Sequence, residues 1–171
     1  MLNSFILFLA SWGHIVIITI IVLSVLWRVR HTHFSLGKKF REAGISIFYF
    51  GVLGASALLV VSLLKWVFPV ARPFIEMGVA PVLSVSPMTS FPSGHAFVLA
   101  ALAFGAYKFS RQLCIILAIL AILVALCRVY LHLHTGLDIA VGYILGAFFG
   151  YFFSVKFMHI DVLEDVWKKL R

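Results

Sequence analysis

Charged side chains are scarce in this chain. Only 12% of its 171 residues are Asp, Glu, Lys or Arg, whereas 63% are hydrophobic. A soluble domain is usually about half apolar and roughly a quarter charged. So little charge cannot cover a surface that faces water, which excludes an ordinary soluble domain and a disordered chain. Because the apolar runs are continuous rather than alternating, we expect an integral membrane protein built from helices rather than a barrel.

Acidic residues and cysteines are few as well. Six acidic residues stand against 14 Lys and Arg, which gives a net charge of +8. In a membrane protein such an excess first indicates topology, so we expect no nucleic-acid partner. The two cysteines, Cys114 and Cys127, fall in one expected helix, where they would lie roughly 20 Å apart. That separation excludes a disulfide between them and predicts two buried free thiols.

Five apolar segments are candidates for membrane helices. A span needs about 20 apolar residues, so the third and fourth segments are short. The N-terminal segment has no basic start and no small-residue cleavage site after it, which predicts a retained membrane segment rather than a signal peptide. Trp12 could mark its true outer end and leave residues 1–10 at the interface. We expect one all-α domain over 1–171, a polytopic membrane helical bundle with spans at residues 5–27, 45–64, 93–108, 113–127 and 137–157.

Small residues predict where these helices pack closely. Gly142, Gly146 and Gly150 repeat every four residues on one face of the last span, and Gly51 and Ala55 do so in the second. Such spacing lets helix backbones approach each other in a membrane. The segment 158–171 after the last span has apolar residues on one stripe and charges elsewhere, which predicts an interfacial amphipathic helix.

The segment 65–92 interrupts this pattern. All five prolines of the chain fall between residues 69 and 92. Proline removes a backbone donor and clashes with the preceding helical turn, so no regular membrane helix can cover this stretch. We expect a long structured loop at one membrane face, and loops of this length tend to be functional.

The basic residues divide unevenly between the two sides of the five-span arrangement. Of the 14 Lys and Arg, 11 lie in the polar loop 28–42, in the turn at Lys108 and Arg111, or in the C-terminal region that starts at Lys156. Because such residues collect in cytoplasmic loops, the N-terminus and the loop 65–92 are expected outside and the C-terminal segment in the cytoplasm. Lys65, Arg72 and Arg128 remain on the outer side and need another explanation.

Those three cations belong to three clusters that the topology places at the same membrane face. The clusters are Lys65, Arg72 and Pro73; Pro92, Ser93, Gly94 and His95; and Arg128, His134 and Asp138. Taken singly, the cations could be interfacial anchors, and Ser93 or Asp138 could simply serve a helix start. Their convergence on one face, against the charge trend, instead favours a functional site.

The residue types in these clusters suit phosphoryl transfer. Arg and Lys supply positive charge for phosphate oxygens, and Ser93 and Gly94 open a helix whose free N–H groups favour an anion. His134 and Asp138 lie one helical turn apart, so the carboxylate can fix the tautomer and leave the other ring nitrogen free to attack phosphorus. His95 is then available as a general acid for the departing alkoxide.

In order and spacing, the segment from Lys65 to Asp138 resembles the three-part signature of the type-2 phosphatidic acid phosphatase superfamily. These membrane lipid phosphatases share a site design with vanadium haloperoxidases. The resemblance implies the same helical core and no metal or other cofactor. Cys127 stands where the family usually has Ser, which affects only a hydrogen bond from that position. The resemblance also assigns the roles: phosphate binding by Lys65, Arg72, Arg128, Ser93 and Gly94, a phosphohistidine at His134, proton donation by His95, and orientation of His134 by Asp138.

The expected substrate is a lipid phosphate. Small bacterial members that resemble this chain include lipid A 1-phosphatases, phosphatidylglycerophosphate phosphatases and undecaprenyl diphosphate phosphatases. The compact chain and its short middle helices suit a bulky lipid that enters from the membrane, and we favour lipid A 1-phosphate, with phosphatidylglycerophosphate as a second substrate. The resemblance places the protein in the bacterial inner membrane with its site facing the periplasm. It makes no prediction of oligomeric state.

Other interpretations remain open at this point. His132, His134, Asp138 and His95 could bind a metal, although three nearby cations would repel a dication. An anion or lipid-phosphate transporter would hold buried charges, but usually near the bilayer midplane and with internal repeats. A non-catalytic lipid-binding or assembly protein would use the cations without the two histidines.

The remaining histidines and two further polar residues receive weaker expectations. His132 is expected to be interfacial or to support the site indirectly. The other histidines are expected to be solvated or interfacial: His14, His31, His33 and His159. Glu76 and Tyr130 could touch substrate, although spacing alone does not support it.

Overall fold

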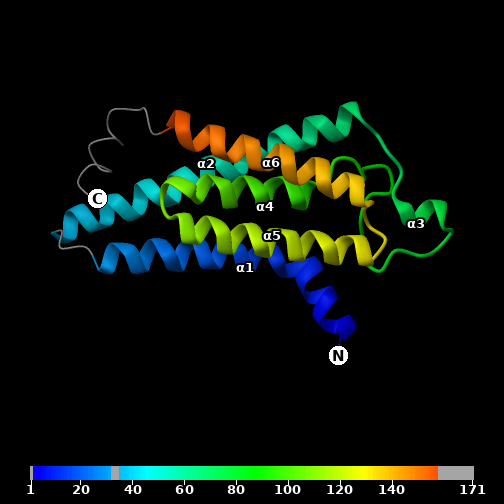
Figure 1. Cartoon of the computed structure of the whole chain (residues 1–171), viewed down its shortest axis with the longest axis horizontal. Coiled ribbons are helices and arrows are strands. Elements are labelled where there is room, and N and C mark those ends of the chain that lie inside the picture. The colour runs from blue at the N-terminus through cyan, green and yellow to red at the C-terminus, as the bar shows by residue number, and fades with distance from the viewer. Residues whose placement is uncertain (1, 32–34, 158–171) are drawn as a thin grey trace.

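The computed structural model describes residues 2–31 and 35–157, and in these residues it contains helices and no strand. Two long helices are followed by a loop with a short helix, and three more helices complete the bundle (Figure 1). Their bounds are α1 Leu2–Arg30, α2 Leu36–Val67, α3 Pro73–Glu76, α4 Gly94–Gly105, the 3-10 helix η1 Ala106–Lys108, α5 Arg111–Tyr130 and α6 Gly136–Phe157. The expected all-α membrane bundle is confirmed.

The segment 28–42 is largely helical, although the sequence analysis expected a polar loop there. Arg28 and Arg30 form the last turn of α1, and α2 begins at Leu36. Lys, Arg and Glu are good helix formers, so a helix can continue past the apolar region when its polar side chains reach water. The 32 residues of α2 span about 48 Å, which exceeds the roughly 30 Å hydrocarbon core of a bilayer.

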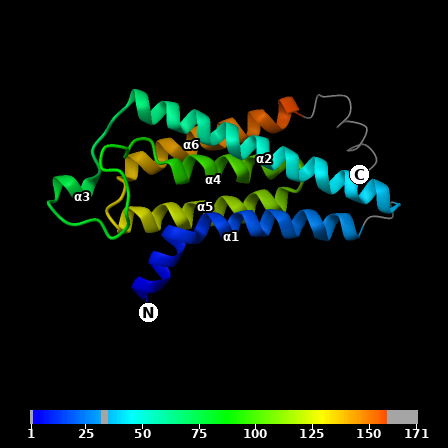
Figure 2. The same ribbon diagram turned by 180° about the vertical axis from the view of Figure 1, so that it is seen from behind.

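The short helix α4 occupies the centre of the bundle. In both views it lies between the pair α2 and α6 and the pair α1 and α5 (Figures 1 and 2). Its 12 residues span about 18 Å, and most of them, including the alanines, are buried against neighbouring helices. Among the described residues, four helices are long and apolar enough to cross a membrane: α1, α2, α5 and α6. The expected count of five spans is therefore approximate, because α4 is enclosed by the other helices and is shorter than they are.

Three glycines of α6 explain how closely this helix approaches α4. A Cβ atom at Gly142 would lie 2.7 Å from the carbonyl oxygen of Ser93. At Gly146 and Gly150 a Cβ would overlap the backbone of Phe97 and Ala101. The small-residue repeat in the last span thus forms the close contact that the sequence analysis expected.

The corresponding expectation for the second span is wrong. Gly51 and Ala55 are both exposed, and a Cβ at Gly51 would meet nothing within 4 Å. Gly54 is the glycine of α2 that faces α4, with Leu102 at 3.8 Å from its Cβ position. Spacing alone does not show which face of a helix is covered.

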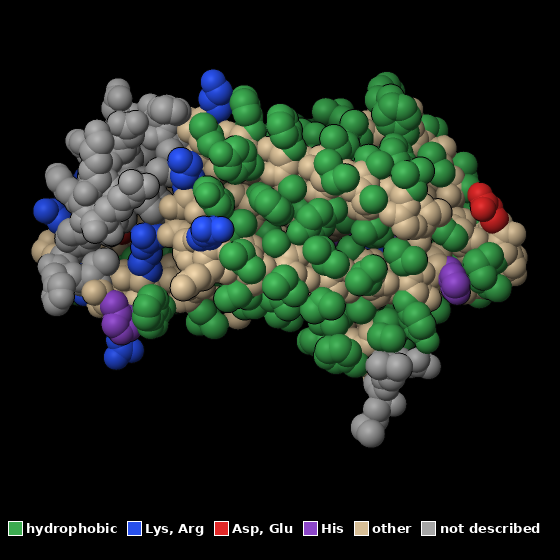
Figure 3. Space-filling view, in the orientation of Figure 1, with side chains coloured by type: hydrophobic (Ala, Val, Ile, Leu, Met, Phe, Trp, Pro, Cys, Tyr) green, Lys and Arg blue, Asp and Glu red, His purple; other side chains and the backbone are tan. Residues whose placement is uncertain are grey.

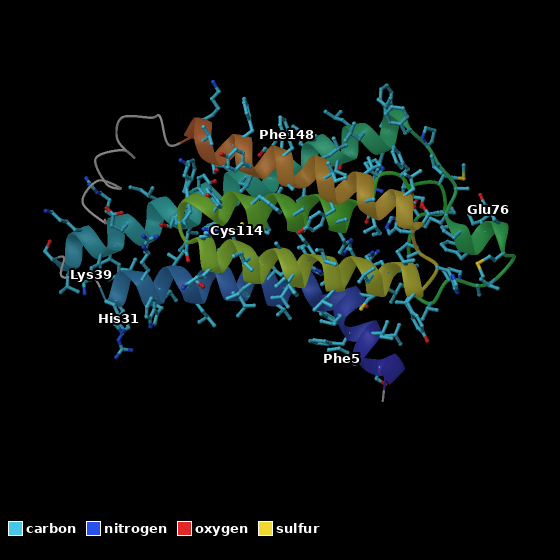
Figure 4. The ribbon with its side chains drawn as sticks, viewed as in Figure 1. Phe5, His31, Lys39, Glu76, Cys114 and Phe148 are labelled. Atoms are coloured by element: carbon cyan, nitrogen blue, oxygen red, sulfur yellow. The ribbon has the colours of Figure 1, made fainter. Side chains whose placement is uncertain are left out.

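The proline-rich segment closes one end of the bundle. It contains α3, which starts with Pro73, and then turns at Gly78, whose φ of 65° is in the left-handed region. Two backbone bonds hold the two ends of the segment together: the Arg72 N–H donates to Pro87 O, and the Ser90 N–H donates to Val70 O, each at 2.9 Å. Figure 4 shows Glu76 on α3 at this end and His31 and Lys39 at the opposite end.

The outer surface is apolar along the length of the helices. The space-filling view shows a broad band of hydrophobic side chains, with Lys and Arg gathered at the end opposite to α3 (Figure 3). Cys114 is buried and Cys127 is half-buried, and both are free, as expected. The expected amphipathic segment 158–171 lies outside the described residues, as do His33 and His159.

Candidate active site

The three sequence clusters meet at the end of the bundle that carries α3. The residues of these clusters come from five different helices or their ends. Lys65 lies in the last turn of α2, Arg72 precedes α3, Ser93 caps α4, Arg128 lies in the last turn of α5, and Asp138 lies in the first turn of α6. Because five elements end or begin here, the fold brings together residues that are up to 73 positions apart in the sequence.

His134 lies at the centre of this group and is only 2% exposed. Its Nε2 lies 3.1 Å from an Nη1 of Arg72, and its Nδ1 lies 3.6 Å from Oδ2 of Asp138. A guanidinium only donates hydrogen bonds, so Nε2 carries the lone pair and we assign the ring proton to Nδ1, on the side of the carboxylate. Burial, together with the charges of Arg72, Arg128 and Lys65, lowers the pKa of His134 to about 2. The imidazole is therefore neutral at physiological pH.

Asp138 is held by hydrogen bonds that the sequence analysis missed. Its Oδ2 accepts from Ser90 Oγ at 2.6 Å and from the Thr135 N–H at 2.8 Å. Thr135 Oγ1 accepts in return from the Asp138 N–H at 3.1 Å, which makes a reciprocal cap at the start of α6. The spacing Thr-x-x-Asp before an apolar run was a signal for this cap. No local pattern signalled Ser90, which is fully buried and lies 48 positions before Asp138.

Arg72 is fixed by the loops on both sides of the site. Its Nε donates to Ser86 O and its Nη1 to Leu133 O, both at 2.7 Å, while Nη2 lies 3.4 Å from Thr89 Oγ1. Only 6% of the residue is exposed, and burial lowers the pKa of the guanidinium from its ordinary value. A buried guanidinium held by neutral carbonyls retains its positive charge for an anion.

Lys65 faces the same region from α2. Its Nζ donates to the carbonyl oxygens of Thr89 and Ser90, just before α4 begins. Its side chain also passes Gly94, where a Cβ would come within 3.4 Å of the lysine Cε. The small residue at this position thus gives the lysine room to lie across the start of α4.

Ser93 and Gly94 open α4, as the sequence predicted. Ser93 is fully buried, its Oγ accepts from the Ala96 N–H at 3.5 Å, and its own N–H donates to Asp138 O at 3.0 Å. In this arrangement the Ser93 side chain caps the helix, and its backbone joins α4 to α6. An anion at this helix start would meet the remaining free N–H groups of the first turn.

His95 and Arg128 form the second half of the site, next to α1. Nη1 of Arg128 lies 3.5 Å from His95 Nε2 and donates to Ala10 O in α1 at 2.7 Å. The ring of His14 packs against the ring of His95, with centroids 5.8 Å apart. The expectation that His14 is solvated is therefore wrong, because its ring packs against His95 and its Nδ1 is buried. Nothing in the sequence indicates that α1 reaches the site.

Three residues with weaker expectations lie at the edge of this region or beyond it. His132 is exposed and has a φ of 55°, and Glu76 and Tyr130 are also exposed. Within the described part of the chain, no three His, Cys, Asp or Glu side chains lie close enough to hold a metal ion. His132 is therefore not part of a ligand set with His134 and Asp138 there.

Comparison with known proteins relates this geometry to a family. The model of the PAP2 superfamily matches residues 46–159, more than half of the chain and a stretch that includes all three clusters. An undecaprenyl-diphosphatase of Sulfolobus acidocaldarius is 28% identical over 99% of this chain and 77% of its own length.

A solved structure has the same fold. The crystal structure of the first transmembrane PAP2-type phosphatidylglycerolphosphate phosphatase from Bacillus subtilis matches with a TM-score of 0.59 and 23% identity. The match covers 93% of this chain and 78% of that one. The helical bundle, its apolar surface and the family match agree, and the chain belongs to the PAP2 superfamily of membrane phosphatases.

Proposed function

We propose that this phosphatase removes a terminal phosphate from a membrane lipid through a phosphohistidine at His134. The observation that carries the proposal is the orientation of this imidazole. Its Nε2 lone pair faces Arg72, and its Nδ1 faces Asp138. The positive charges of Lys65, Arg72 and Arg128 all act on this imidazole. A neutral, oriented imidazole surrounded by cations is suited to attack a phosphoryl group.

The first step transfers the phosphoryl group to the protein. Nε2 of His134 attacks phosphorus in line, a P–N bond forms, and the P–O bond to the lipid breaks. The electron pair of that bond stays on the departing oxygen, which takes a proton from the imidazolium form of His95 and leaves that imidazole neutral. In the second step the neutral His95 removes a proton from water, whose oxygen attacks phosphorus. A P–O bond forms, the P–N bond breaks with its electron pair returning to Nε2 of His134, and inorganic phosphate leaves.

The cations stabilise the charge that the phosphoryl oxygens carry in both steps. Arg72 already lies against Nε2 of His134, so a phosphoryl group bound there has the guanidinium within reach. Loss of one such charged donor typically costs about 10²- to 10³-fold in kcat. Asp138 holds the proton side of the imidazole and favours the cationic form that arises as the P–N bond develops.

A polyprenyl diphosphate is the substrate that we place first. The supporting observation is that the relative from Sulfolobus acidocaldarius, which matches nearly the whole chain, is named an undecaprenyl-diphosphatase. Phosphatidylglycerophosphate and lipid A 1-phosphate, favoured from the sequence alone, also carry a terminal phosphate, but as a monoester rather than a diphosphate, and are the competing substrates. The chemistry at His134 is common to all three.

We further propose that the site faces the outer side of the cytoplasmic membrane of a bacterium, with the C-terminus inside. The exposed cations Arg30, Lys38, Lys108 and Lys156 lie at helix ends opposite to the site, in agreement with the distribution of cytoplasmic charge. A transporter or a lipid-binding protein is not favoured, because the family is one of phosphatases.

Phosphate release by the purified protein in detergent tests the proposal. Undecaprenyl diphosphate, phosphatidylglycerophosphate, lipid A and phosphatidic acid are offered at equal concentration in the micelle, with and without EDTA. We expect the highest kcat/KM with undecaprenyl diphosphate and no loss with EDTA. A higher kcat/KM for another lipid would contradict the substrate proposal and leave the mechanism standing.

The nucleophile is tested by His134→Ala, with His132→Asn as the matched control. Loss of a catalytic nucleophile lowers kcat by roughly 10³- to 10⁶-fold. His132 is exposed two residues away at positive φ, which Asn tolerates, so this control should keep wild-type activity. Acid-labile, base-stable labelling by a radioactive substrate should appear in the wild type and not in His134→Ala. A folded His134→Ala protein with wild-type phosphatase activity would contradict the mechanism.

A further inference from the structure

The first membrane helix contributes a side chain to the site, although it lies outside the three motifs and outside the matched residues 46–159. His14 of α1 packs edge-on against His95 of α4, with a centroid distance of 5.8 Å and an angle of 76° between the ring planes. This edge-to-face arrangement is the one that aromatic rings prefer. Nδ1 of His14 is buried and has no hydrogen-bond partner, so the contact with His95 is one between rings.

Two other contacts fix this part of α1 against α5. Nη1 of Arg128 donates to Ala10 O at 2.7 Å, one helical turn before His14. Gly13 packs so closely on Val124 that a Cβ there would overlap the valine side chain. Both views show α1 alongside α5 and then bending away toward its N-terminus (Figures 1 and 2). A side chain that inserts into the hydrogen-bond ladder of a helix is a known cause of such a bend, and Arg128 bonds to the ladder carbonyl of Ala10.

His95 is therefore held from two sides. Its Nε2 faces Nη1 of Arg128 at 3.5 Å, and its ring meets the ring of His14. The 3.5 Å between Nη1 of Arg128 and Nε2 of His95 is long for a hydrogen bond, so this contact alone holds the imidazole weakly. A ring packed against the imidazole restricts its rotation about χ2, an angle that otherwise varies over a broad range.

We propose that His14 is a positioning residue, which holds the imidazole of His95 in the orientation from which it protonates the leaving oxygen. The inference rests on the proposed function, because it assumes that His95 is the general acid. A misplacement of about 1 Å in a reacting group can cost about 10²-fold in rate. His14 acts through its ring, so a phenyl ring at the same place replaces it and a methyl group does not.

Leaving-group dependence separates this role from a merely structural one. An alkyl phosphate has a basic leaving oxygen that must be protonated, whereas p-nitrophenyl phosphate releases a stable phenolate without help. A variant that misplaces the general acid slows the alkyl ester selectively. A variant that only loosens the fold slows both substrates to the same extent.

The experiment compares four folded variants in detergent with a short-chain alkyl phosphate and p-nitrophenyl phosphate. His14→Ala should lower kcat roughly tenfold on the alkyl ester and less than about threefold on the aryl ester, with KM little changed. His14→Phe should restore most of the alkyl activity. His31→Ala is the matched control, because His31 directly follows the same helix and also makes a ring contact, with Trp27, at the opposite end. It should match the wild type.

His95→Ala makes the two levels of the proposal distinguishable. It should show the same selectivity as His14→Ala but to a larger extent, about 10²- to 10⁴-fold on the alkyl ester. If His95→Ala is not selective, the assignment of the general acid is wrong. If His95→Ala is selective but His14→Ala is not, or if His14→Phe behaves like His14→Ala, the positioning role of His14 is wrong.

Discussion

At the scale of single residues, the site depends on buried polar groups that support one another. Oδ2 of Asp138 accepts two hydrogen bonds, from Ser90 and from the Thr135 backbone, and lies 3.6 Å from the imidazole of His134. In the proposed mechanism, these bonds keep the carboxylate in place while the imidazole of His134 attacks phosphorus. Buried charges are tolerated only when they are paired and hydrogen-bonded, and each residue here supplies part of that pairing.

Ser90→Ala should weaken catalysis without preventing folding. The change removes the 2.6 Å hydrogen bond to Asp138, and a hydrogen bond to a charged group contributes about 1.5–3 kcal/mol. We expect kcat to fall roughly tenfold, with KM almost unchanged because the serine acts on Asp138 rather than on the lipid. Steady-state kinetics on the preferred lipid measure both quantities.

The matched control is Ser62→Ala, at an exposed position of α2. This variant should retain the wild-type kcat. A wild-type kcat in Ser90→Ala, or a large increase in KM at constant kcat, would show that the bond does not serve the nucleophile.

At the scale of secondary structure elements, the contact between α4 and α6 sets the relative position of His95 and Asp138, which are both proposed to act in catalysis. Ser93 joins the start of α4 to Asp138, and three glycines keep α6 against the α4 backbone along the rest of its length. His95 and Asp138 lie in the first turns of these two helices. A shift between the helices therefore moves the proposed proton donor relative to the residue proposed to orient the nucleophile.

Gly146→Ala should destabilise the protein, whereas Gly51→Ala should not. The new methyl group would overlap the Phe97 backbone in the first variant and meet nothing within 4 Å in the second. Overpacking typically costs about 1–3 kcal/mol, and replacing an exposed helical glycine by alanine gains up to about 1 kcal/mol. Thermal unfolding midpoints of the two variants in the same detergent measure the difference. Equal midpoints would contradict the close contact of α4 and α6.

At the scale of the whole molecule, most of the exposed basic side chains lie at one end of the bundle and the site lies at the other (Figure 3). Most Lys and Arg of the described residues are remote from α3, whereas Lys65, Arg72 and Arg128 at the site end contact backbone carbonyls or the histidines proposed to be catalytic. An apolar surface covers the length between them (Figure 3). The bundle can therefore cross a membrane with its site at one face only.

Accessibility labelling tests the proposed orientation. In a protein with Cys114 and Cys127 replaced by alanine, Glu76→Cys and Lys38→Cys each place one thiol at an exposed position at opposite ends of the bundle. A membrane-impermeant maleimide should label Glu76→Cys in intact cells and Lys38→Cys only after permeabilisation. The reverse pattern would place the site in the cytoplasm.

The sequence by itself determined the class of the fold and the identities of the residues proposed for the site. Long apolar runs dictate membrane helices, because backbone polar groups in lipid must be satisfied within the segment. The clusters at Lys65, Ser93 and Arg128 are local patterns, and local patterns can be recognised without coordinates. The glycine repeat of α6 was also sufficient to predict a close helix contact.

Only the tertiary structure decided which residues from other elements complete these clusters. Ser90 and His14 have no distinguishing local pattern, and their partners Asp138 and His95 lie 48 and 81 positions away. The same is true of the face of α2 that is covered and of the enclosed position of the short α4. Such features depend on how helices pack in three dimensions, where a contact is set by crossing geometry and side-chain volume rather than by spacing along the chain.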